Sequence, residues 1–215
     1  MIIAVDGPTA AGKGTLAKRL AAHYGLALLD TGKLYRAVGL KTLQAGAAPE
    51  DAEAAARAAL SLTAADLDLP GLRAEAVSRA ASVVAVNAGV RAALVDFQRQ
   101  FAHMPPGGAK GAVLDGRDIG TVICPDADVK IFLTASQEAR AERRWRQLQS
   151  SGATTIKARV LADLQERDER DSARSLAPLK AAPDAFLLDT TAMDADQAFA
   201  AAVEHIELKR TGRRP

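Results

Sequence analysis

The stretch Gly7-Pro8-Thr9-Ala10-Ala11-Gly12-Lys13-Gly14-Thr15 decides the fold class. It follows a short apolar run, Ile2–Val5, and opens an amphipathic segment, Lys13–His23, so it lies between a predicted strand and a predicted helix. Glycines let backbone N–H groups point at phosphate oxygens, the helix N-terminus adds partial positive charge, and Lys13 reaches the β- and γ-phosphates. A glycine-rich turn with a solvated lysine is the alternative, and the position between strand and helix argues against it. We therefore predict that these nine residues bind a nucleoside triphosphate.

The loop departs from the usual pattern directly after its lysine. Gly14 stands where Ser or Thr is usual, and Thr15 comes one place later. Because Gly14 has no hydroxyl, it cannot be a ligand of Mg²⁺. We expect Mg²⁺ to accompany the nucleotide, held mainly by phosphates and water and without a direct protein ligand.

Four further apolar runs have the character of buried strands. They are nearly continuous rather than alternating, which is typical of strands covered on both faces of a parallel sheet: Leu26–Leu29, Ala112–Leu114, Val129–Leu133 and Ala185–Leu188. Three of the five runs end in Asp followed by Gly or Thr, at Asp6, Asp30 and Asp115. Open α/β sheets bind ligands at the carboxyl ends of their strands. The sequence therefore predicts an α/β fold with a five-stranded parallel sheet, flanked by helices, and a ligand site at that edge.

The remaining segments read as helices. After Lys13–His23 these are Leu34–Gln44, Asp51–Leu62, Ala74–Asn87, Val90–Phe101, Glu138–Gln149, Ile156–Arg170 and Asp194–Leu208. We predict one chain, 1–215, whose core comprises about 1–44, 103–145 and 159–215. A helical insertion at about 45–102 and a short lid at about 146–158, hinged at Ser150–Ala153, interrupt it. Helical insertions over the ligand edge of a sheet act as clamps and lids.

The composition of the chain limits the classes of partner that we expect for the protein. With 215 residues, 48% apolar and 25% charged, the chain has the composition of a globular protein. A net charge of +2 argues against nucleic-acid binding driven by net charge, and no run approaches the roughly 20 apolar residues of a membrane span. The single Cys124 excludes an intrachain disulfide. We expect a cytoplasmic protein, a monomer, with small-molecule substrates and no nucleic-acid or membrane partner.

Arginines are the second functional signal. Five fall near predicted strand ends or insertions: Arg36, Arg91, Arg117, Arg167 and Arg174. Arg167, Asp171 and Arg174 are spaced i, i+4 and i+7, which predicts one shared helix face. Four more are candidates for an arginine-rich lid that closes over a transferred phosphoryl group: Arg140, Arg143, Arg144 and Arg146. A solvated pair of salt-bridged helices is the alternative for this charged region.

The triphosphate site alone leaves the class of protein open between kinase, switch GTPase and motor ATPase. The sequence has no guanine-reading Asn-Lys-x-Asp and no strand of four apolar residues that ends in Asp-Glu. These absences argue against a GTPase and a motor and favour a kinase.

Four segments make the similarity specific. Gly7–Thr15 resembles the phosphate loop of nucleoside monophosphate kinases, and Leu28–Arg36, Asp115–Val122 and Glu166–Asp171 resemble the corresponding segments of the bacterial cytidylate kinase family. The resemblance runs from residue 2 to about 205. It implies phosphoryl transfer from ATP to CMP or dCMP, a step of pyrimidine nucleotide metabolism.

The resemblance also implies residue roles. The phosphate loop holds ATP, while Arg36, Arg117 and Arg167 grip the acceptor phosphate with Thr31 beside it. Ser82, Arg91 and Asp118 match positions that read cytosine; Asp171 binds the sugar hydroxyls, with Arg174 at the reaction centre. On this basis we expect the catalytic side chains to be Lys13, Arg117, Arg167 and Arg174. A carboxylate can accept from the exocyclic amine of cytosine, and arginine can donate to its carbonyl and N3.

The sequence departs from the family pattern in the insertion. Lys33 stands where a small apolar residue is commonest, Asn87 where proline is common, and Ser61–Leu72 is shorter than the expected strand-bearing segment. Two rivals remain: a kinase for another small acceptor such as UMP or shikimate, and a nucleotide-dependent switch without acceptor chemistry. Asp118 argues against UMP, because a carboxylate facing a uracil carbonyl is repulsive.

Several conspicuous residues are given no substrate-binding role. His23, His103 and His205 lack metal-ligand spacing and are interpreted as structural or surface residues. We expect Cys124 to be packed and Trp145 to cover the apolar side of the lid. Asp6 is expected to orient the phosphate loop or a metal-bound water.

Overall fold

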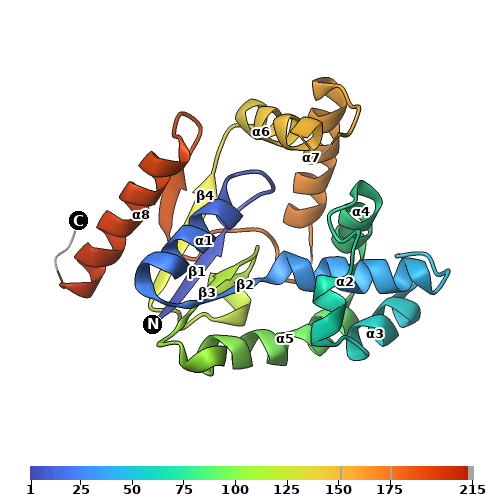
Figure 1. Cartoon of the computed structure of the whole chain (residues 1–215), viewed down its shortest axis with the longest axis horizontal. Coiled ribbons are helices and arrows are strands. Elements are labelled where there is room, and N and C mark those ends of the chain that lie inside the picture. The colour runs from blue at the N-terminus through green and yellow to red at the C-terminus, as the bar shows by residue number, and fades with distance from the viewer. Residues whose placement is uncertain (151, 175, 213–215) are drawn as a thin grey trace.

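A five-stranded parallel sheet forms the centre of the computed structural model, which describes residues 1–150, 152–174 and 176–212 (Figure 1). The strands are β1 (Ile2–Asp6), β2 (Ala27–Asp30), β3 (Ala112–Asp115), β4 (Val129–Thr134) and β5 (Phe186–Asp189). Their order across the sheet is β2-β3-β1-β4-β5, and every pairing is parallel. All five predicted strands are confirmed, and so is the fold class.

The central strands β1, β3 and β4 are buried on both faces, which explains their continuous apolar runs, whereas the edge strands β2 and β5 expose Leu28 and Leu187. Alternate residues of β1 enter different cores, since Ile3 and Val5 pack with α1 (Lys13–Tyr24) and α8 (Ala195–Arg210). Ala4 packs on the other face with apolar side chains of α2 (Thr31–Gln44) and α5 (Ala88–His103). A strand that contributes to two cores cannot show an alternating pattern.

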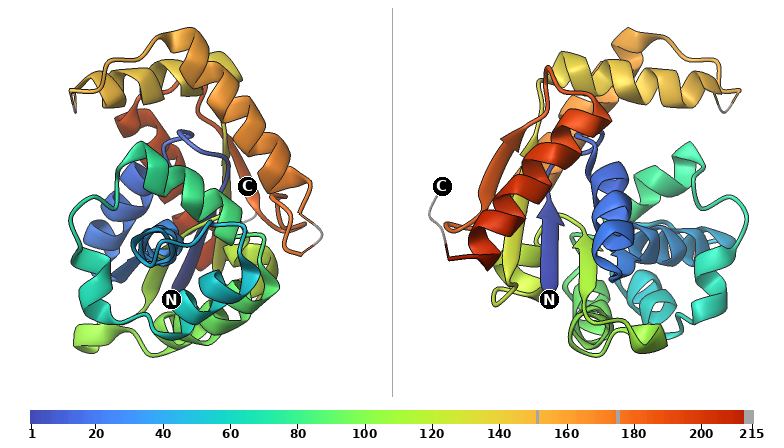
Figure 2. Two further views of the ribbon diagram at one scale, coloured as in Figure 1. Left: turned by 90° about the vertical axis from the view of Figure 1, so that its right-hand side faces the viewer. Right: turned by 60° about the vertical axis from the view of Figure 1, so that its left-hand side comes forward.

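The predicted insertion is helical. It contains α3 (Ala52–Leu60), the short helix η1 (Ala64–Asp68), α4 (Glu75–Val84) and α5. These helices gather around α2 on one side of the sheet (Figures 1 and 2). Two of the three departures noted in the insertion, Lys33 and Asn87, make structural contacts here. Asn87 caps α5 and its Nδ2 donates to Ala52 O at 2.8 Å, and Lys33 Nζ bonds to Asp68 Oδ1 at 2.9 Å.

The predicted lid region forms a pair of packed helices, α6 (Gln137–Ser150) and α7 (Lys157–Ser172). They share a small apolar cluster in which Trp145 packs against Ala141, Val160 and Leu164. Trp145 Nε1 donates to Thr155 O at 3.0 Å, which confirms that this ring covers the apolar side of the pair. Of the predicted hinge, Ser151 lies outside the described residues.

Two helix boundaries differ from the sequence prediction and matter for the site. Helix α2 begins at Thr31, three residues early, because the Asp30 side chain caps it by accepting from Lys33 N at 3.1 Å. Helix α7 ends at Ser172, so Arg174 lies beyond the helix and the predicted shared face of Arg167, Asp171 and Arg174 is wrong in its last member.

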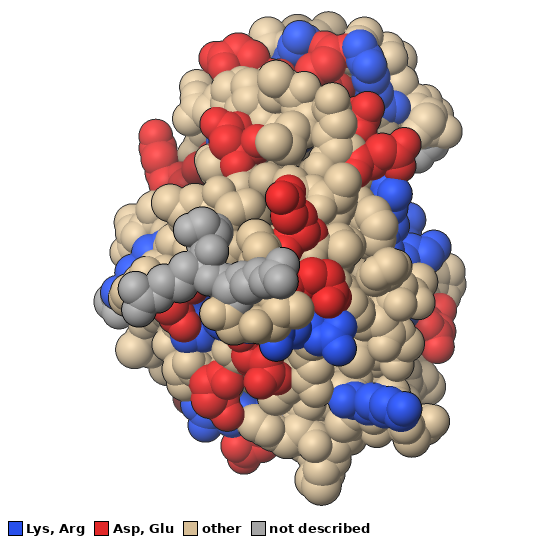
Figure 3. All heavy atoms as spheres, turned by 90° about the vertical axis from the view of Figure 1, so that its left-hand side faces the viewer, with Lys and Arg blue, Asp and Glu red and all other residues tan. Residues whose placement is uncertain are grey.

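The surface carries mixed charge. On the face that bears α8, Lys and Arg side chains are interspersed with Asp and Glu, in keeping with the small net charge (Figure 3). Within the described ranges no single helix is long and apolar enough to cross a membrane, although α4 and the segment from Ala88, bent by 97° at their junction, pass that test as a pair.

Candidate active site

The phosphate loop joins the end of β1 to the start of α1. Gly7 has a φ of 142°, and a Cβ there would lie 2.2 Å from Leu133 O, so only glycine fits beside β4. Helix α1 has no side-chain N-cap, which leaves its first N–H groups available to an anion. Lys13 Nζ spans the loop and donates to Pro8 O at 2.8 Å. This geometry is that of a phosphate cradle.

Lys13 is buried among positive neighbours. Burial, together with the charges of Arg117 and Arg167, lowers the pKa of its ammonium to about 7, against the opposing effect of Asp115. A buried ammonium beside two guanidinium groups is stabilised by a bound anion. The electrostatics of Lys13 therefore match a triphosphate ligand.

Asp115 was predicted to lie at the ligand edge of the sheet, but its specific role was not. It is the cross-strand partner of Asp30, and burial raises the pKa of its carboxyl. A Cβ placed on Gly14 would lie 3.3 Å from Asp115 Oδ2, so the glycine after the lysine makes room for this carboxylate at the start of α1. The signal was present in the sequence: an Asp at the end of the strand next to β1.

Asp6 was expected to orient the phosphate loop, but its side chain holds the segment Ile119–Gly120 instead. Its two carboxylate oxygens accept from Ile119 N at 2.9 Å and Gly120 N at 2.8 Å, and burial raises its pKa to about 7. Asp6 therefore positions the segment that follows Asp118 rather than the phosphate loop.

Arg117 connects the phosphate loop to α7. Its Nη2 donates to Thr9 Oγ1 at 2.8 Å, and its Nε donates to Asp171 Oδ2 at 3.1 Å. Arg174 pairs with the other oxygen of Asp171, a carboxylate whose side chain is only 1% exposed. These three residues, far apart in the chain, form one buried ionic cluster.

The neighbouring arginines carry unused donors. Among the described residues four buried side-chain polar atoms lack a hydrogen-bond partner, and three of them are the Nε atoms of Arg36, Arg167 and Arg174. Burial and, after it, the charge of Arg117 lower the pKa of Arg167 to about 10. Buried unpaired donors are costly, and here they are concentrated where cationic charge is already dense. Such a cluster is an anion site.

Two of the three predicted cytosine-reading residues meet directly. Arg91 and Asp118 form a buried ion pair in which each side chain is 7% exposed, and Arg91 Nη1 also donates to Ala85 O at the end of α4. Burial raises the pKa of the Asp118 carboxyl, and the charge of Arg91 opposes that rise. The third, Ser82, lies one turn earlier on α4 and accepts instead from Arg170 Nη1 at 3.0 Å.

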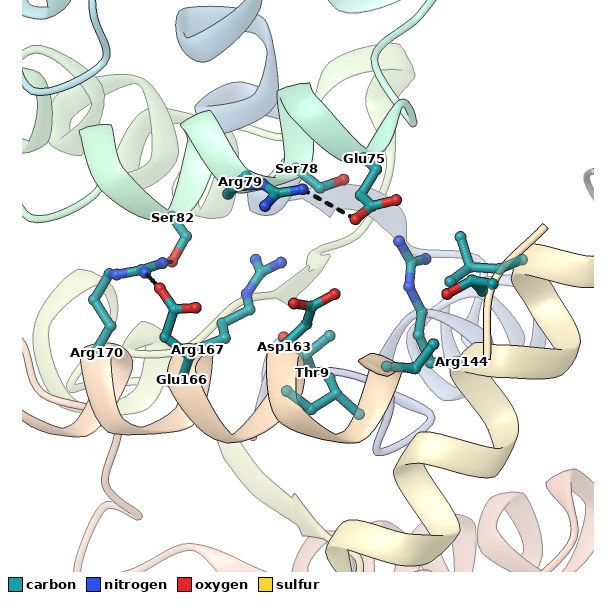
Figure 4. Close-up of a pocket in the computed structure, with 14 residues that line it drawn as sticks. Thr9, Glu75, Ser78, Arg79, Ser82, Arg144, Asp163, Glu166, Arg167 and Arg170 are labelled. Carbon is teal, nitrogen blue, oxygen red and sulfur yellow. Dashed lines mark hydrogen bonds and ion pairs between the residues drawn. The ribbon is translucent and has the colours of Figure 1, made fainter. Parts of the chain in front are cut away.

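A cleft lies between α4 and the pair α6 and α7. Figure 4 shows polar side chains from both sides pointing into it. The labelled lining residues are Thr9, Glu75, Ser78, Arg79, Ser82, Arg144, Asp163, Glu166, Arg167 and Arg170. Thr9 brings the phosphate loop to this cleft, which Ser82 and Arg167, two of the predicted acceptor-binding residues, also line.

The four lid candidates differ in position. Arg144 lines the cleft. Arg140 is buried and pairs with Asp168 at 2.6 Å, and Arg143 donates to Thr190 Oγ1 at 3.0 Å after β5. The Arg146 side chain is 74% exposed and pairs with Glu142. Only Arg144 of the four is placed to meet a substrate in the cleft.

The residues that were given no substrate-binding role pack elsewhere. His205 stacks on Phe186, His23 makes edge contacts with Tyr24 and Phe199, and Cys124 is fully buried. His103 lies on the surface 3.7 Å from Asp126. Over the described ranges, no group of three His, Cys, Asp or Glu side chains could hold a metal ion.

Comparison with known proteins agrees with this geometry. The family model for cytidylate kinase matches residues 3–208. The chain is 61% identical over 209 residues to the cytidylate kinase of Paramagnetospirillum magneticum, which covers 97% of this chain and 99% of that protein. It is 58% identical over 213 residues to the cytidylate kinase of Xanthobacter autotrophicus, covering 99% and 100% of the two chains. The crystal structure of an uncharacterized protein from Eubacterium ventriosum shares the fold, with a TM-score of 0.57 and 15% identity over 96% of this chain and 98% of that one. The chain belongs to the cytidylate kinase family.

Proposed function

We propose that this protein transfers the γ-phosphoryl group of ATP to CMP and dCMP, forming CDP and dCDP. The observation that carries the proposal is the set of three buried, unpartnered Nε donors on Arg36, Arg167 and Arg174. The charges of Arg117 and Arg167 act on Lys13 of the phosphate loop, so this anion site and the triphosphate cradle lie within electrostatic reach of each other. Two adjacent anion sites suit one phosphate donor and one phosphate acceptor.

On the donor side, residues Gly7–Thr15 hold the phosphates of ATP. Their backbone N–H groups and Lys13 neutralise charge on the β- and γ-phosphates. Asp115 places a single carboxylate beside Gly14 at the start of α1, which suits contact with the water shell of a hydrated Mg²⁺. Mg²⁺ on the phosphates would supply further neutralisation of the triphosphate, and Asp115 would accept hydrogen bonds from water bound to it.

On the acceptor side, Arg36, Arg117 and Arg167 grip the phosphate of CMP. Asp30 orients Arg36 at 2.7 Å, and Asp171 orients Arg117 at 3.1 Å. Both guanidinium groups are therefore held in place before substrate binds. The Thr31 hydroxyl donates to Asp115 O at 2.8 Å. Since its only hydrogen is used there, Thr31 fixes the position of Asp115 rather than donating to the acceptor phosphate.

The base and sugar lie toward α4 and α7. The carboxylate of Asp118 accepts from the cytosine amine, and Arg91, its ion-pair partner, donates to acceptor atoms of the same base. Asp171 accepts from sugar hydroxyls with the lone pairs that Arg117 and Arg174 leave free.

The reaction needs no general base. The attacking atom is an oxygen of the CMP phosphate, which already carries negative charge. Lys13, Arg117, Arg167 and Arg174 hold donor and acceptor in line and stabilise charge on the transferred group, with Arg144 of the lid facing the same cleft. Positioning and electrostatic stabilisation therefore account for the rate enhancement of phosphoryl transfer.

The test is steady-state ADP formation with ATP·Mg²⁺ and each of CMP, dCMP, UMP, AMP and GMP, with identification of the diphosphate product. A strong preference for CMP and dCMP is expected. Comparable turnover of UMP overturns the cytosine contacts, and ATP hydrolysis that no acceptor changes overturns the kinase. A monomeric state and a cytoplasmic location stay predictions from the sequence.

A further inference from the structure

Two residues of the proposed acceptor site, Arg117 and Asp118, are neighbours in the segment that leads from β3 into the short helix η3 (Ile119–Ile123). This segment passes over the end of β1, because Gly116 N donates to Val5 O at 3.0 Å just beyond the paired part of β1 and β3. The last turn of backbone in β1 therefore lies against the segment that carries both acceptor-site side chains.

Asp6, the last residue of β1, holds this segment by its backbone. Its Oδ1 accepts from Ile119 N at 2.9 Å and its Oδ2 from Gly120 N at 2.8 Å, so it fixes the peptide group directly after Asp118. Asp6 is 5% exposed, and a buried carboxylate is costly unless it is hydrogen-bonded. Hydrogen bonds to a charged acceptor are stronger than neutral ones, so these two are firm restraints on η3.

The far end of η3 is held by Arg99, an exposed residue of α5. Arg99 Nε donates to Ile123 O at 3.1 Å, and Arg99 Nη2 donates to Val122 O at 3.0 Å. About two turns earlier on α5, Arg91 pairs with Asp118 at the start of η3. A helix of five residues has little stability of its own, so the place of η3 depends on these contacts from outside it.

We infer that Asp6 is a positioning residue for the acceptor site, which acts through the backbone of η3 to hold Arg117 and Asp118 where they meet CMP, with Arg99 as its counterpart at the far end. The inference rests on the proposed function. Asp6 directly precedes the phosphate loop in the chain, yet its loss affects the binding of CMP rather than that of ATP. A displacement of about 1 Å is enough to weaken such contacts strongly.

The experiment uses Asp6→Asn, which keeps the size of the side chain and one accepting oxygen but places an NH₂ group against a backbone N–H. We expect KM for CMP to rise about tenfold, and the ratio of kcat/KM for CMP to that for UMP to fall about threefold. The Kd of ATP, measured without acceptor, is expected not to rise. Assays at about pH 8 keep wild-type Asp6 ionised, since burial raises its pKa only to about 7.

Asp128→Asn is the matched control. Asp128 Oδ2 accepts from Ile2 N at 2.7 Å, so the same substitution alters the same kind of bond at the opposite end of β1. Its kinetic constants are expected to equal those of the wild type.

The Kd of ATP and the base ratio decide between positioning and other roles. A Kd for ATP that rises as much as KM for CMP assigns Asp6 to the phosphate loop and overturns the inference, and so does an unchanged KM for CMP. The base ratio is independent of the fraction folded. It has already fallen in Asp118→Asn, so adding Asp6→Asn is expected to leave it there, and an equal further fall overturns the inference.

Arg99→Met tests the other end of η3 by removing an exposed side chain that lies outside the substrate cleft. We expect KM for CMP to rise about threefold, again with no rise in the Kd of ATP. Where thermal unfolding shows that Asp6→Asn is not folded, this variant carries the test, and an unchanged KM for CMP overturns the inference. Wild-type protein that makes no CDP overturns the proposed function itself, which is a different result from an active enzyme whose variants keep the wild-type KM.

Discussion

Arg117 and Asp171 stand 54 positions apart in the chain, yet Arg117 Nε donates to Asp171 Oδ2 at 3.1 Å. The same guanidinium reaches Thr9 Oγ1 at 2.8 Å. One side chain therefore joins the phosphate loop, the segment after β3 and the end of α7. In the proposed reaction, an acceptor phosphate held by Arg117 would thereby be fixed relative to the donor phosphates in the loop.

Arg117→Ala is expected to lower kcat for CMP by about 10³-fold, because a positioned arginine contributes about that much to phosphoryl transfer. Arg117→Lys restores the charge but not the forked geometry, so it is expected to recover only part of the loss. Steady-state kinetics with saturating ATP measure both. Arg146→Ala removes a 74% exposed arginine and is expected to leave kcat unchanged. A fall of less than tenfold in Arg117→Ala contradicts the role given to Arg117.

Asp118→Asn tests base reading without deleting the side chain. The carboxylate that accepts from the amine of cytosine becomes an amide that can also donate to the carbonyl of uracil. We expect the preference for CMP over UMP, measured as the ratio of kcat/KM values, to fall at least about tenfold. Equal preference in the variant and the wild type rules out a base-reading Asp118.

The fold of that variant needs its own measurement. Arg91 and Asp118 are a buried pair, and removing one charge from such a pair costs about 3–5 kcal/mol of unfolding free energy. Urea unfolding of Asp118→Asn beside Arg91→Met shows how much of any activity loss comes from instability. The altered ratio between CMP and UMP is independent of the fraction folded, since both substrates meet the same enzyme.

Arg140 is expected to stabilise the protein rather than to bind substrate. Its guanidinium is 4% exposed, pairs with Asp168 on α7 at 2.6 Å and donates to Thr9 O at 3.3 Å. Arg140→Ala leaves Asp168 without its partner, and we expect it to lower the unfolding free energy by about 3–5 kcal/mol. Arg146→Ala loses only an exposed pair within one helix, worth about 0.3–0.5 kcal/mol. Denaturant unfolding measures both, and equal costs would contradict the assignment.

The arginines of α6 show which features of the site could not be predicted from the sequence. Strands buried on both faces are visible as continuous apolar runs, so the sheet could be predicted. The phosphate loop has a characteristic spacing of two glycines and a lysine, so its place in the chain could be predicted too. Arg140 and Arg144 lie four residues apart on one face of α6, and the sequence treats them alike. The first reaches Thr9 and is buried, whereas the second extends over the cleft. That difference depends on where α6 crosses the phosphate loop, which is set by tertiary packing.

The hydrogen bond from Arg170 to Ser82 could not be predicted from the sequence for the same reason. It joins residues 88 positions apart whose helices face each other only across the folded cleft. Asp115 had a sequence signal at the end of its strand, but its place beside Gly14 follows from the register of β3 between β1 and β2.

The lowered pKa of Lys13 predicts that ATP binding is accompanied by proton uptake. Burial, with the charges of Arg117 and Arg167, lowers the pKa of Lys13 to about 7 in the free protein, so above that pH the amine is mostly neutral. A bound triphosphate favours the ammonium and raises this pKa again. Binding therefore takes up protons between the free and the bound pKa, and the affinity for ATP falls as the pH rises through that interval.

Calorimetric titration with ATP, free of divalent metal, at about pH 8.5 measures the uptake, because the ATP phosphates are fully ionised there and add no protons of their own. The binding enthalpy in two buffers of different ionisation enthalpy is expected to give close to one proton taken up per ATP bound. Lys13→Arg carries a guanidinium that stays charged at this pH, so its uptake is expected to vanish while a positive side chain remains in the loop. Uptake of the same size in Lys13→Arg assigns the proton to another group, and no uptake in the wild type means that Lys13 is already charged in the free protein.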